Sequence, residues 1–170
     1  MATLPVLAPV AGTVIAVADV PDPVFSASLV GPGAAITPDP VFSAGLVGPG
    51  TALSPDPDAG GTAVAPVDGV VVKLHPHAFV VAADDGRAVL VHLGIDTVEL
   101  HGDGFTLHVA EGDRVSAGQP VIGWDPAAVR DGGRSAVVPV VALDADAEEL
   151  SGLAEVGAAV TAGDVLFTIA

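Results

Sequence analysis

Residues 77–93, HAFVVAADDGRAVLVHL, decide the fold of this chain. Two short apolar segments, 78–82 and 88–93, flank an acidic turn that contains a glycine, which is the pattern of a β-hairpin. Valine and leucine in such segments fit the pleated, half-buried surface of a sheet. The stretch therefore predicts two antiparallel strands at the centre of a β-rich protein.

The same pattern of short apolar segments between turn signals recurs along the rest of the chain. Strands are expected over residues 13–17, 70–74, 78–82, 88–93, 106–109, 121–124, 136–142 and 165–169. Two short helices are expected, one starting at Pro126 with Asp125 as its N-cap and one over residues 146–154. So many short strands with so little helix predict an all-β fold, an antiparallel β-sandwich or barrel with one or two short helices. At 170 residues, we expect a single domain over residues 1–170.

Composition and charge narrow the function classes. Hydrophobic residues make up 51% of the chain but aromatic residues only 4%, so the core must be built from Val, Ala, Leu and Ile. The net charge of −16 excludes binding to nucleic acid or to an anionic membrane, which require the opposite sign. There is no cysteine, which excludes thiol catalysis and disulfides. With no signal peptide pattern at the start and no long apolar helix, we expect a cytoplasmic protein without membrane insertion.

A tandem duplication interrupts the first third of the chain. Residues 21–37, PDPVFSASLVGPGAAIT, recur at 38–54 as PDPVFSAGLVGPGTALS, with 13 of 17 positions identical. One interpretation is a surface insertion that is tolerated because long loops add little entropic cost. The other is that both copies compete for one docking site, which would give two registers or a domain swap.

His77 and His92 are the residues at which we expect chemistry. If the hairpin turns through four residues, His77 lies directly opposite His92, and if it turns through Asp85 and Gly86 alone, the two lie diagonally. Both registers place the two imidazoles on one face of the hairpin. Both also place on that face the apolar residues Phe79, Val81 and Leu90.

Two imidazoles on an apolar surface have three interpretations: a structural pair, a metal site, or nucleophilic and proton-transfer chemistry. A neutral imidazole nitrogen is a competent nucleophile toward phosphorus near neutral pH. A second imidazole beside it could donate hydrogen bonds to the arriving phosphoryl oxygens. The residues alone leave these alternatives open.

Several motifs resemble the glucose-type enzyme IIA family of the bacterial phosphoenolpyruvate-dependent sugar phosphotransferase system. The resemblance is carried by the following segments: the opening APV-GTV, DVPDPVF at 19–25, APVDG at 65–69, PHAF at 76–79, VHLGIDTVEL at 91–100, GDGF at 102–105, EGDRVSAGQPVI at 111–122 and PVVAL at 139–143. It covers nearly the whole chain except the second repeat copy. It implies an antiparallel β-sandwich, a duplicated hybrid motif, that carries phosphoryl groups for sugar uptake.

The resemblance also implies roles for individual residues. His92 matches the phosphoacceptor that receives a phosphoryl group from phospho-HPr, and His77 matches the second histidine, which supports that group for transfer to a IIB cysteine. Asp96 lies close to this site in the same motif. Because the chain has no cysteine, the IIB and IIC components are expected on separate polypeptides, and no cofactor is required. The docking surface would include, by match, Val24, Phe25, Leu29 and Val30, or Val41, Phe42, Leu46 and Val47, together with Leu90 and Val98.

Parts of the sequence also resemble motifs of proteins with other functions. A zinc endopeptidase is suggested by His92, Asp96 and the His-Pro-His tripeptide at 75–77, although those elements stand in the reverse of that family's order. A biotinyl or lipoyl carrier would need its lysine at a hairpin tip, but Lys73 lies within an expected strand. A purely regulatory IIA-like protein with other binding targets stays open, as does zinc binding by His77 and His92. The remaining histidines, His101 and His108, are expected to be exposed or structural.

Overall fold

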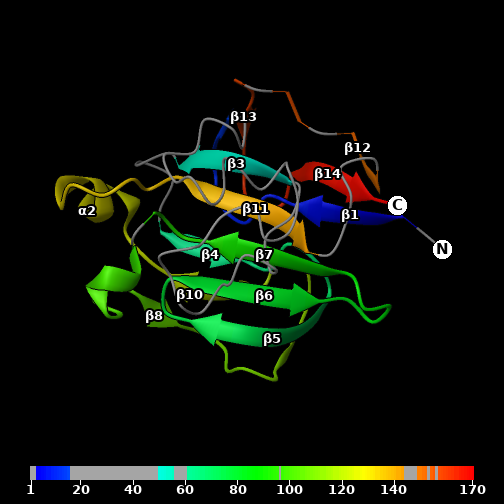
Figure 1. Ribbon diagram of the computed structural model, residues 1–170, viewed down its shortest axis with the longest axis horizontal. Helices are drawn as coiled ribbons and strands as arrows, with labels where there is room; N and C mark the ends of the chain where they lie inside the picture. Colours follow the sequence, from blue (N-terminus) through cyan, green and yellow to red (C-terminus); the bar gives the residue numbers. More distant parts are fainter. Residues whose placement is uncertain are drawn as a thin grey trace.

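The computed structural model describes residues 3–15, 50–55, 61–95, 97–143, 149–152, 154–155 and 157–170 (Figure 1). Its strands are β1 (Leu4–Leu7), β2 (Gly12–Ile15), β3 (Gly50–Pro55), β4 (Thr62–Val64), β5 (Gly69–His75), β6 (Ala78–Ala82), β7 (Ala88–His92), β8 (Thr106–Leu107), β9 (Arg114–Val115), β10 (Pro120–Gly123), β11 (Val138–Leu143), β12 (Leu150–Ser151), β13 (Ala159–Val160) and β14 (Val165–Ile169). The helical elements of this part of the chain are the 3-10 turn η4 (Thr97–Leu100) and the helix α2 (Pro126–Asp131).

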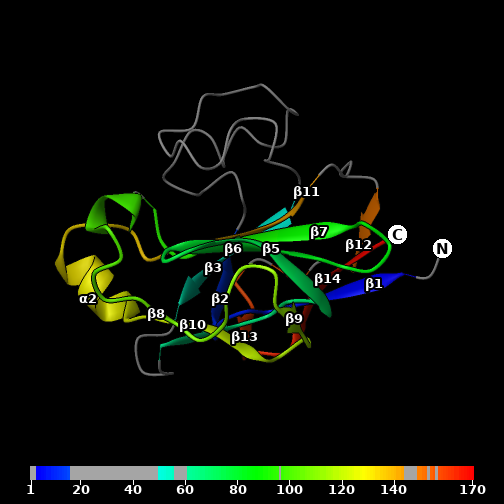
Figure 2. The same cartoon turned by 90° about the horizontal axis from the view of Figure 1, so that it is seen from below.

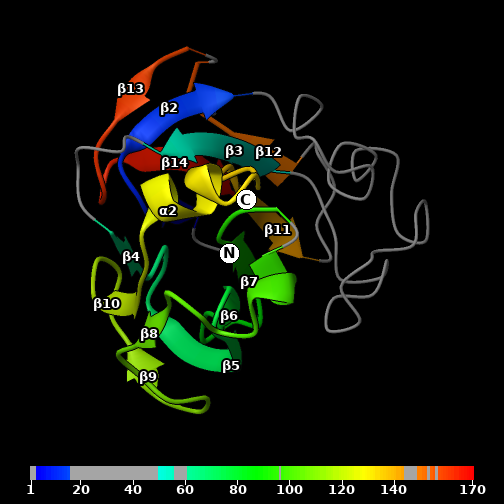
Figure 3. The same cartoon turned by 90° about the vertical axis from the view of Figure 1, so that its left-hand side faces the viewer.

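The strands form one large sheet and two small ones. The large sheet has the order β13-β2-β3-β11-β7-β6-β5-β9, and the small sheets have the orders β1-β14-β12 and β4-β10-β8. Figure 2 shows β5, β6 and β7 in one layer and β1, β14 and β10 in the other, and Figure 3 shows the large sheet curving from β13 and β2 to β5 and β9. The predicted antiparallel β-sandwich with little helix is confirmed.

The core between the layers is aliphatic, as the composition predicted. One face of the β6–β7 hairpin contributes Phe79, Val81, Val89 and Val91 to it, all fully buried. Phe79 and Phe167 are the largest of the fully buried side chains. Because strand side chains alternate between faces, Ala78, Val80, Leu90 and His92 lie on the other face of the hairpin.

Both predicted registers of this hairpin are wrong by one residue. The structure pairs Ala78 with His92 and Val80 with Leu90, so Phe79 and Val81 lie on the core face and not with the histidines. The reason is a five-residue loop, residues 83–87, closed by a hydrogen bond of 2.7 Å from the Ala83 nitrogen to the Arg87 oxygen. An odd loop length inverts the side-chain parity that the even-length turns implied.

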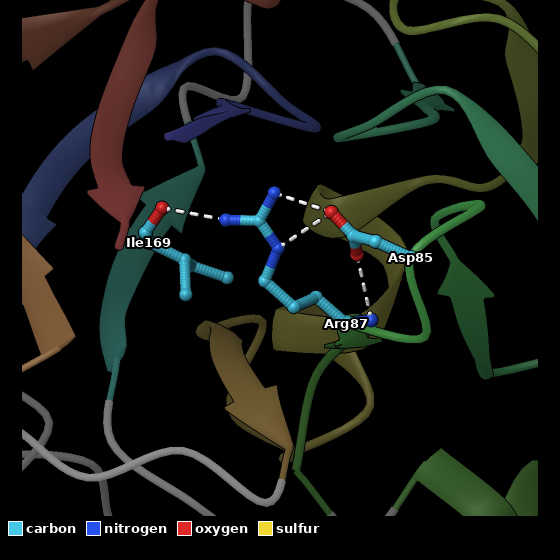
Figure 4. Close-up of polar contacts among 3 residues, drawn as sticks. All are labelled: Asp85, Arg87 and Ile169. Carbon is cyan, nitrogen blue, oxygen red and sulfur yellow. Dashed lines mark hydrogen bonds and ion pairs between the residues drawn. The ribbon is translucent and has the colours of Figure 1, made fainter. Parts of the chain in front are cut away.

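Arg87 stabilises this loop through contacts with Asp85 and Ile169 (Figure 4). Its backbone nitrogen donates to the Asp85 carboxylate at 3.0 Å and its side chain forms an ion pair with the same carboxylate. Its Nη1 also donates to the Ile169 carbonyl oxygen at 2.9 Å, which ties the loop to β14 in one of the two small sheets. Side-chain hydrogen bonds from Arg87 lower the pKa of the Asp85 carboxyl below its ordinary value.

One of the two predicted helices is confirmed. α2 starts at Pro126, and the Asp125 Oδ1 accepts hydrogen bonds from the backbone nitrogens of Ala127 at 3.0 Å and Ala128 at 3.2 Å. The helix expected over 146–154 is wrong where it can be compared, because Leu150–Ser151 forms β12 against β14. Residues 144–148 lie outside the described part of the chain. No helix among the described residues is long and apolar enough to cross a bilayer.

Candidate active site

His77 and His92 lie together, although not through the pairing that the sequence predicted. His92 is the last residue of β7, and His77 lies in the two-residue turn between β5 and β6. Their ring centroids are 5.1 Å apart and the rings are inclined at 69°, an edge-to-face arrangement. Each residue is only 4% exposed. The pair therefore occupies a position with little access to water.

Backbone hydrogen bonds fix the two segments that carry these rings. The Leu93 nitrogen donates to the His77 carbonyl oxygen at 2.7 Å, which joins the end of β7 to the β5–β6 turn. The next two nitrogens, of Gly94 and Ile95, donate to the carbonyl oxygens of Val137 at 3.1 Å and Ser135 at 2.9 Å. The segment after His92 is thus held from both sides.

A short contact selects the tautomer of His92. Its Nδ1 lies 2.6 Å from the Gly94 carbonyl oxygen. Because a carbonyl oxygen can only accept a hydrogen bond, Nδ1 carries the proton of the neutral ring, which places the nucleophilic lone pair on Nε2.

Gly94 can present its carbonyl in this way only because it is glycine. Its φ of +82° lies in the left-handed region, and a Cβ there would come within 2.6 Å of the Thr97 Cγ2 and 2.9 Å of the Ser135 oxygen. Thr97 is itself fixed, since it is buried and its hydroxyl donates to the Leu93 carbonyl oxygen at 2.7 Å. Gly94, Thr97 and Ser135 together hold the acceptor for His92 Nδ1.

A third imidazole adjoins the pair. The His75 ring centroid lies 6.1 Å from that of His77, with the planes inclined at 38°, and His75 is half-buried. The turn between them contacts the loop after η4, because a Cβ on Gly102 would lie 3.3 Å from the Pro76 Cγ. The rings of His75, His77 and His92 therefore form a series that runs inward from a half-buried ring to two buried ones.

The other residues predicted for the site lie in different parts of the structure. Leu90 is fully buried on the same face of β7 as His92, and Val98 lies within η4. His101 and His108 are exposed, as expected. The expected site neighbour and the repeat-borne docking residues lie outside the described residues, namely Asp96, Val24, Phe25, Leu29, Val30, Val41, Phe42, Leu46 and Val47.

The residues that position His92 could not be identified from the sequence. Gly94 and Thr97 belong to the VHLGIDTVEL motif, but their roles depend on a backbone angle and a side-chain contact. Ser135 contributes a main-chain oxygen, for which no sequence signal exists. The described residues contain no group of three or more His, Asp or Glu side chains that could hold a metal ion, so zinc binding by His77 and His92 stays a prediction.

Comparison with known proteins gives one consistent result. The family described as "phosphoenolpyruvate-dependent sugar phosphotransferase system, EIIA 1" matches residues 4–39 and 37–148. The chain is 36% identical over 160 residues to the glucose-specific EIIA component of Bacillus cereus, covering 93% of this chain and 84% of that one. It is 33% identical over 151 residues to the beta-glucoside-specific EIIBCA component of Bacillus subtilis, covering 88% of this chain and 22% of that one. Among solved structures, glucose permease IIA from Mycoplasma capricolum matches with a TM-score of 0.80 and 29% identity, covering 99% of this chain and 96% of that one.

The fold and the paired imidazoles define an antiparallel β-sandwich protein with a buried histidine centre. The comparisons then name the family: this chain belongs to the EIIA 1 family of the phosphoenolpyruvate-dependent sugar phosphotransferase system. It is a phosphocarrier of that system, as the resemblance implied.

Proposed function

We propose that His92 is the residue that carries the phosphoryl group, and that Nε2 is the atom to which it is attached. The observation that supports this assignment is the 2.6 Å contact between Nδ1 and the Gly94 carbonyl oxygen. The neutral ring held in this tautomer has its lone pair on Nε2. The lone pair attacks phosphorus, the P–N bond of the donor breaks, and its electron pair stays on the donor imidazole.

His77 supports the group once it has arrived. An edge-to-face ring at 5.1 Å can direct an N–H toward oxygens bound on His92 and so stabilise the charge of the transition state. Both residues are almost fully buried, which limits hydrolysis of a reactive phosphohistidine. This arrangement suits a group that must wait for its acceptor without being lost to water.

The donor is phospho-HPr and the acceptor is a cysteine of a IIB component. That cysteine lies outside these 170 residues, since the sequence contains none. A relationship to IIB is supported by the Bacillus subtilis relative, whose name joins the B, C and A components. The net charge of −16 favours partners with a basic surface around their own active residue. We place this exchange in the cytoplasm, within a single EIIA domain over residues 1–170.

The test is the intact mass of the protein after incubation with phosphoenolpyruvate, enzyme I and HPr. The wild type should gain one phosphoryl group, His92→Gln should gain none, and His77→Gln should gain one but fail to pass it to IIB. His108→Gln is the matched control, because His108 is an exposed histidine outside the pair, and it should behave as wild type. Phosphorylation of His92→Gln, or no phosphorylation of a folded wild type, would refute the carrier assignment.

The attachment atom has its own measurement. Nuclear magnetic resonance of the phosphorylated protein distinguishes Nε2-phosphohistidine from Nδ1-phosphohistidine. A signal from the Nδ1 form would contradict the tautomer argument even if His92 proved to be the acceptor.

A further inference from the structure

We infer that the position of β3 in the large sheet can be filled by either copy of the duplicated segment. β3, Gly50–Pro55, has the sequence GTALSP and contains the last five residues of the second copy. The corresponding residues of the first copy and the residue after it are 33–38, GAAITP. The chain therefore carries two candidates for one strand.

The requirements of this position can be read from its neighbours. β3 lies between β2 and β11, where Leu53 faces Val14 on one side and Val138 on the other. Leu53 is fully buried and belongs to the core. Ile36 stands at the corresponding place in the first copy, and exchange of Leu for Ile conserves volume. Isoleucine also fits a strand at least as well as leucine.

The remaining contacts of β3 are equally available to the first copy. Gly12 of β2 lies so close to β3 that a Cβ there would come within 2.2 Å of the Ser54 carbonyl oxygen. The atoms of β3 at this contact are backbone atoms, which either copy can supply. Arg130 donates to the Pro55 carbonyl oxygen at 2.6 Å, and Pro38 would supply the same oxygen. The first-copy strand would therefore offer the same backbone groups to these contacts.

The family match divides at the junction of the two copies. Its first piece, residues 4–39, runs through the first copy, and its second piece, residues 37–148, starts at the junction and runs through the second. The first copy is therefore continuous with β1 and β2 in the match, and the second copy is continuous with the strands that follow.

The exchange would change which copy precedes β3. With Gly50–Pro55 in place, both PDPVF segments lie in the connection from β2 to β3. With residues 33–38 in place, the second segment moves to the connection from β3 to β4, at little cost because closure entropy changes slowly with loop length. Phe25 would then be the phenylalanine that shortly precedes the strand, the place that Phe42 has in the sequence when Gly50–Pro55 forms it.

The experiment compares two deletion variants that differ only in which copy remains. Deletion of residues 21–37 keeps the observed strand, and deletion of residues 38–54 leaves only the first copy to replace it. We expect both variants to fold, with circular dichroism spectra like that of the full chain and melting temperatures within a few degrees of each other. An unfolded product of the 38–54 deletion, beside a folded product of the 21–37 deletion, would overturn the inference.

A buried charge tests the same redundancy in the full chain. Leu53→Asp in the 21–37 deletion should lower the melting temperature by about 10 °C or more, or prevent folding, because the carboxylate has no partner in the core. In the full chain the same substitution should lower it by only a few degrees, since residues 33–38 can take the position. Equal losses in the two backgrounds would show that the first copy cannot enter the sheet. These readouts measure folding and are independent of phosphorylation.

Discussion

Substitution of Gly94 by alanine should destabilise the protein for two reasons. The first is conformational, since the φ of +82° costs an alanine roughly 1–2 kcal/mol. The second is steric, since the new Cβ would meet the Thr97 Cγ2 at 2.6 Å and the Ser135 oxygen at 2.9 Å. Thr97 cannot rotate its methyl away without losing its 2.7 Å hydrogen bond to Leu93.

The steric part adds about 1–3 kcal/mol, which is the range for overpacking a well-filled site. We therefore expect Gly94→Ala to lower the free energy of unfolding by about 2–5 kcal/mol in total. Gly86→Ala is the matched control, because Gly86 has a φ of +93° with nothing within 4 Å of the new Cβ. It should cost only the conformational part, roughly 1–2 kcal/mol.

Urea denaturation of the two variants measures the difference directly. The phosphorylation rate gives a second readout, because displacement of the Gly94 carbonyl loosens its contact with His92 Nδ1. We expect Gly94→Ala to accept the phosphoryl group at least about tenfold more slowly, equivalent to about 1.4 kcal/mol, while Gly86→Ala keeps the wild-type rate. If the two variants lose the same stability, the packing argument around Gly94 is wrong. If Gly94→Ala reacts at the wild-type rate, the carbonyl does not orient His92.

Three further predictions concern separate parts of the structure. Asp125→Ala should lower the free energy of unfolding by about 1 kcal/mol through loss of the α2 N-cap, whereas Asp125→Asn should keep most of it, as measured by urea denaturation. Hydrogen bonds from Arg87 lower the pKa of Asp85 in the folded state, so this pair stabilises the fold at pH values above the ordinary Asp pKa. The contribution is lost as the pH falls below that value, because the carboxylate is then protonated. The melting temperatures of wild type and Asp85→Asn should therefore differ at pH 7 and converge in acid. His75→Ala should still be phosphorylated but should pass the group to IIB more slowly, because His75 contacts His77, and equal rates of onward transfer in a quenched-flow assay would contradict this role.

The prediction that His77 and His92 lie close together is confirmed, but the hairpin register on which it was based is wrong. Both predicted registers place His77 opposite or diagonal to His92 across the hairpin, but the residue paired with His92 is Ala78. His77 reaches the same place from a turn, through the hydrogen bond between its carbonyl oxygen and the Leu93 nitrogen. The loop length could not be read from the sequence because one of the contacts that stabilise the loop, from Arg87 to Ile169, joins residues 82 positions apart.

The fold could be predicted where a strand is long enough to show a local pattern of apolar residues between turn signals. The hairpin strand β6 was predicted with its observed bounds, and β7 to within one residue, since both are apolar and bounded by turn signals. Shorter strands such as β9, β12 and β13 have two residues each, which is too little for any periodicity to show. They exist because a neighbouring strand offers an edge, as β14 does for β12.

β3 was not predicted from the sequence, and the reason is the duplication. Its residues lie inside a repeat, so any local property that favours a strand at Gly50–Pro55 favours one at 33–38 as well. What selects between them is the free energy of the whole sheet, in which Leu53 is paired with Val14 and Val138 and Ile36 would take the same place. Because exchange of leucine for isoleucine conserves side-chain volume, the selection depends on the connections that flank the strand. A partner that binds one copy in preference to the other would therefore shift the strand as well, by as much as its affinities for the two arrangements differ.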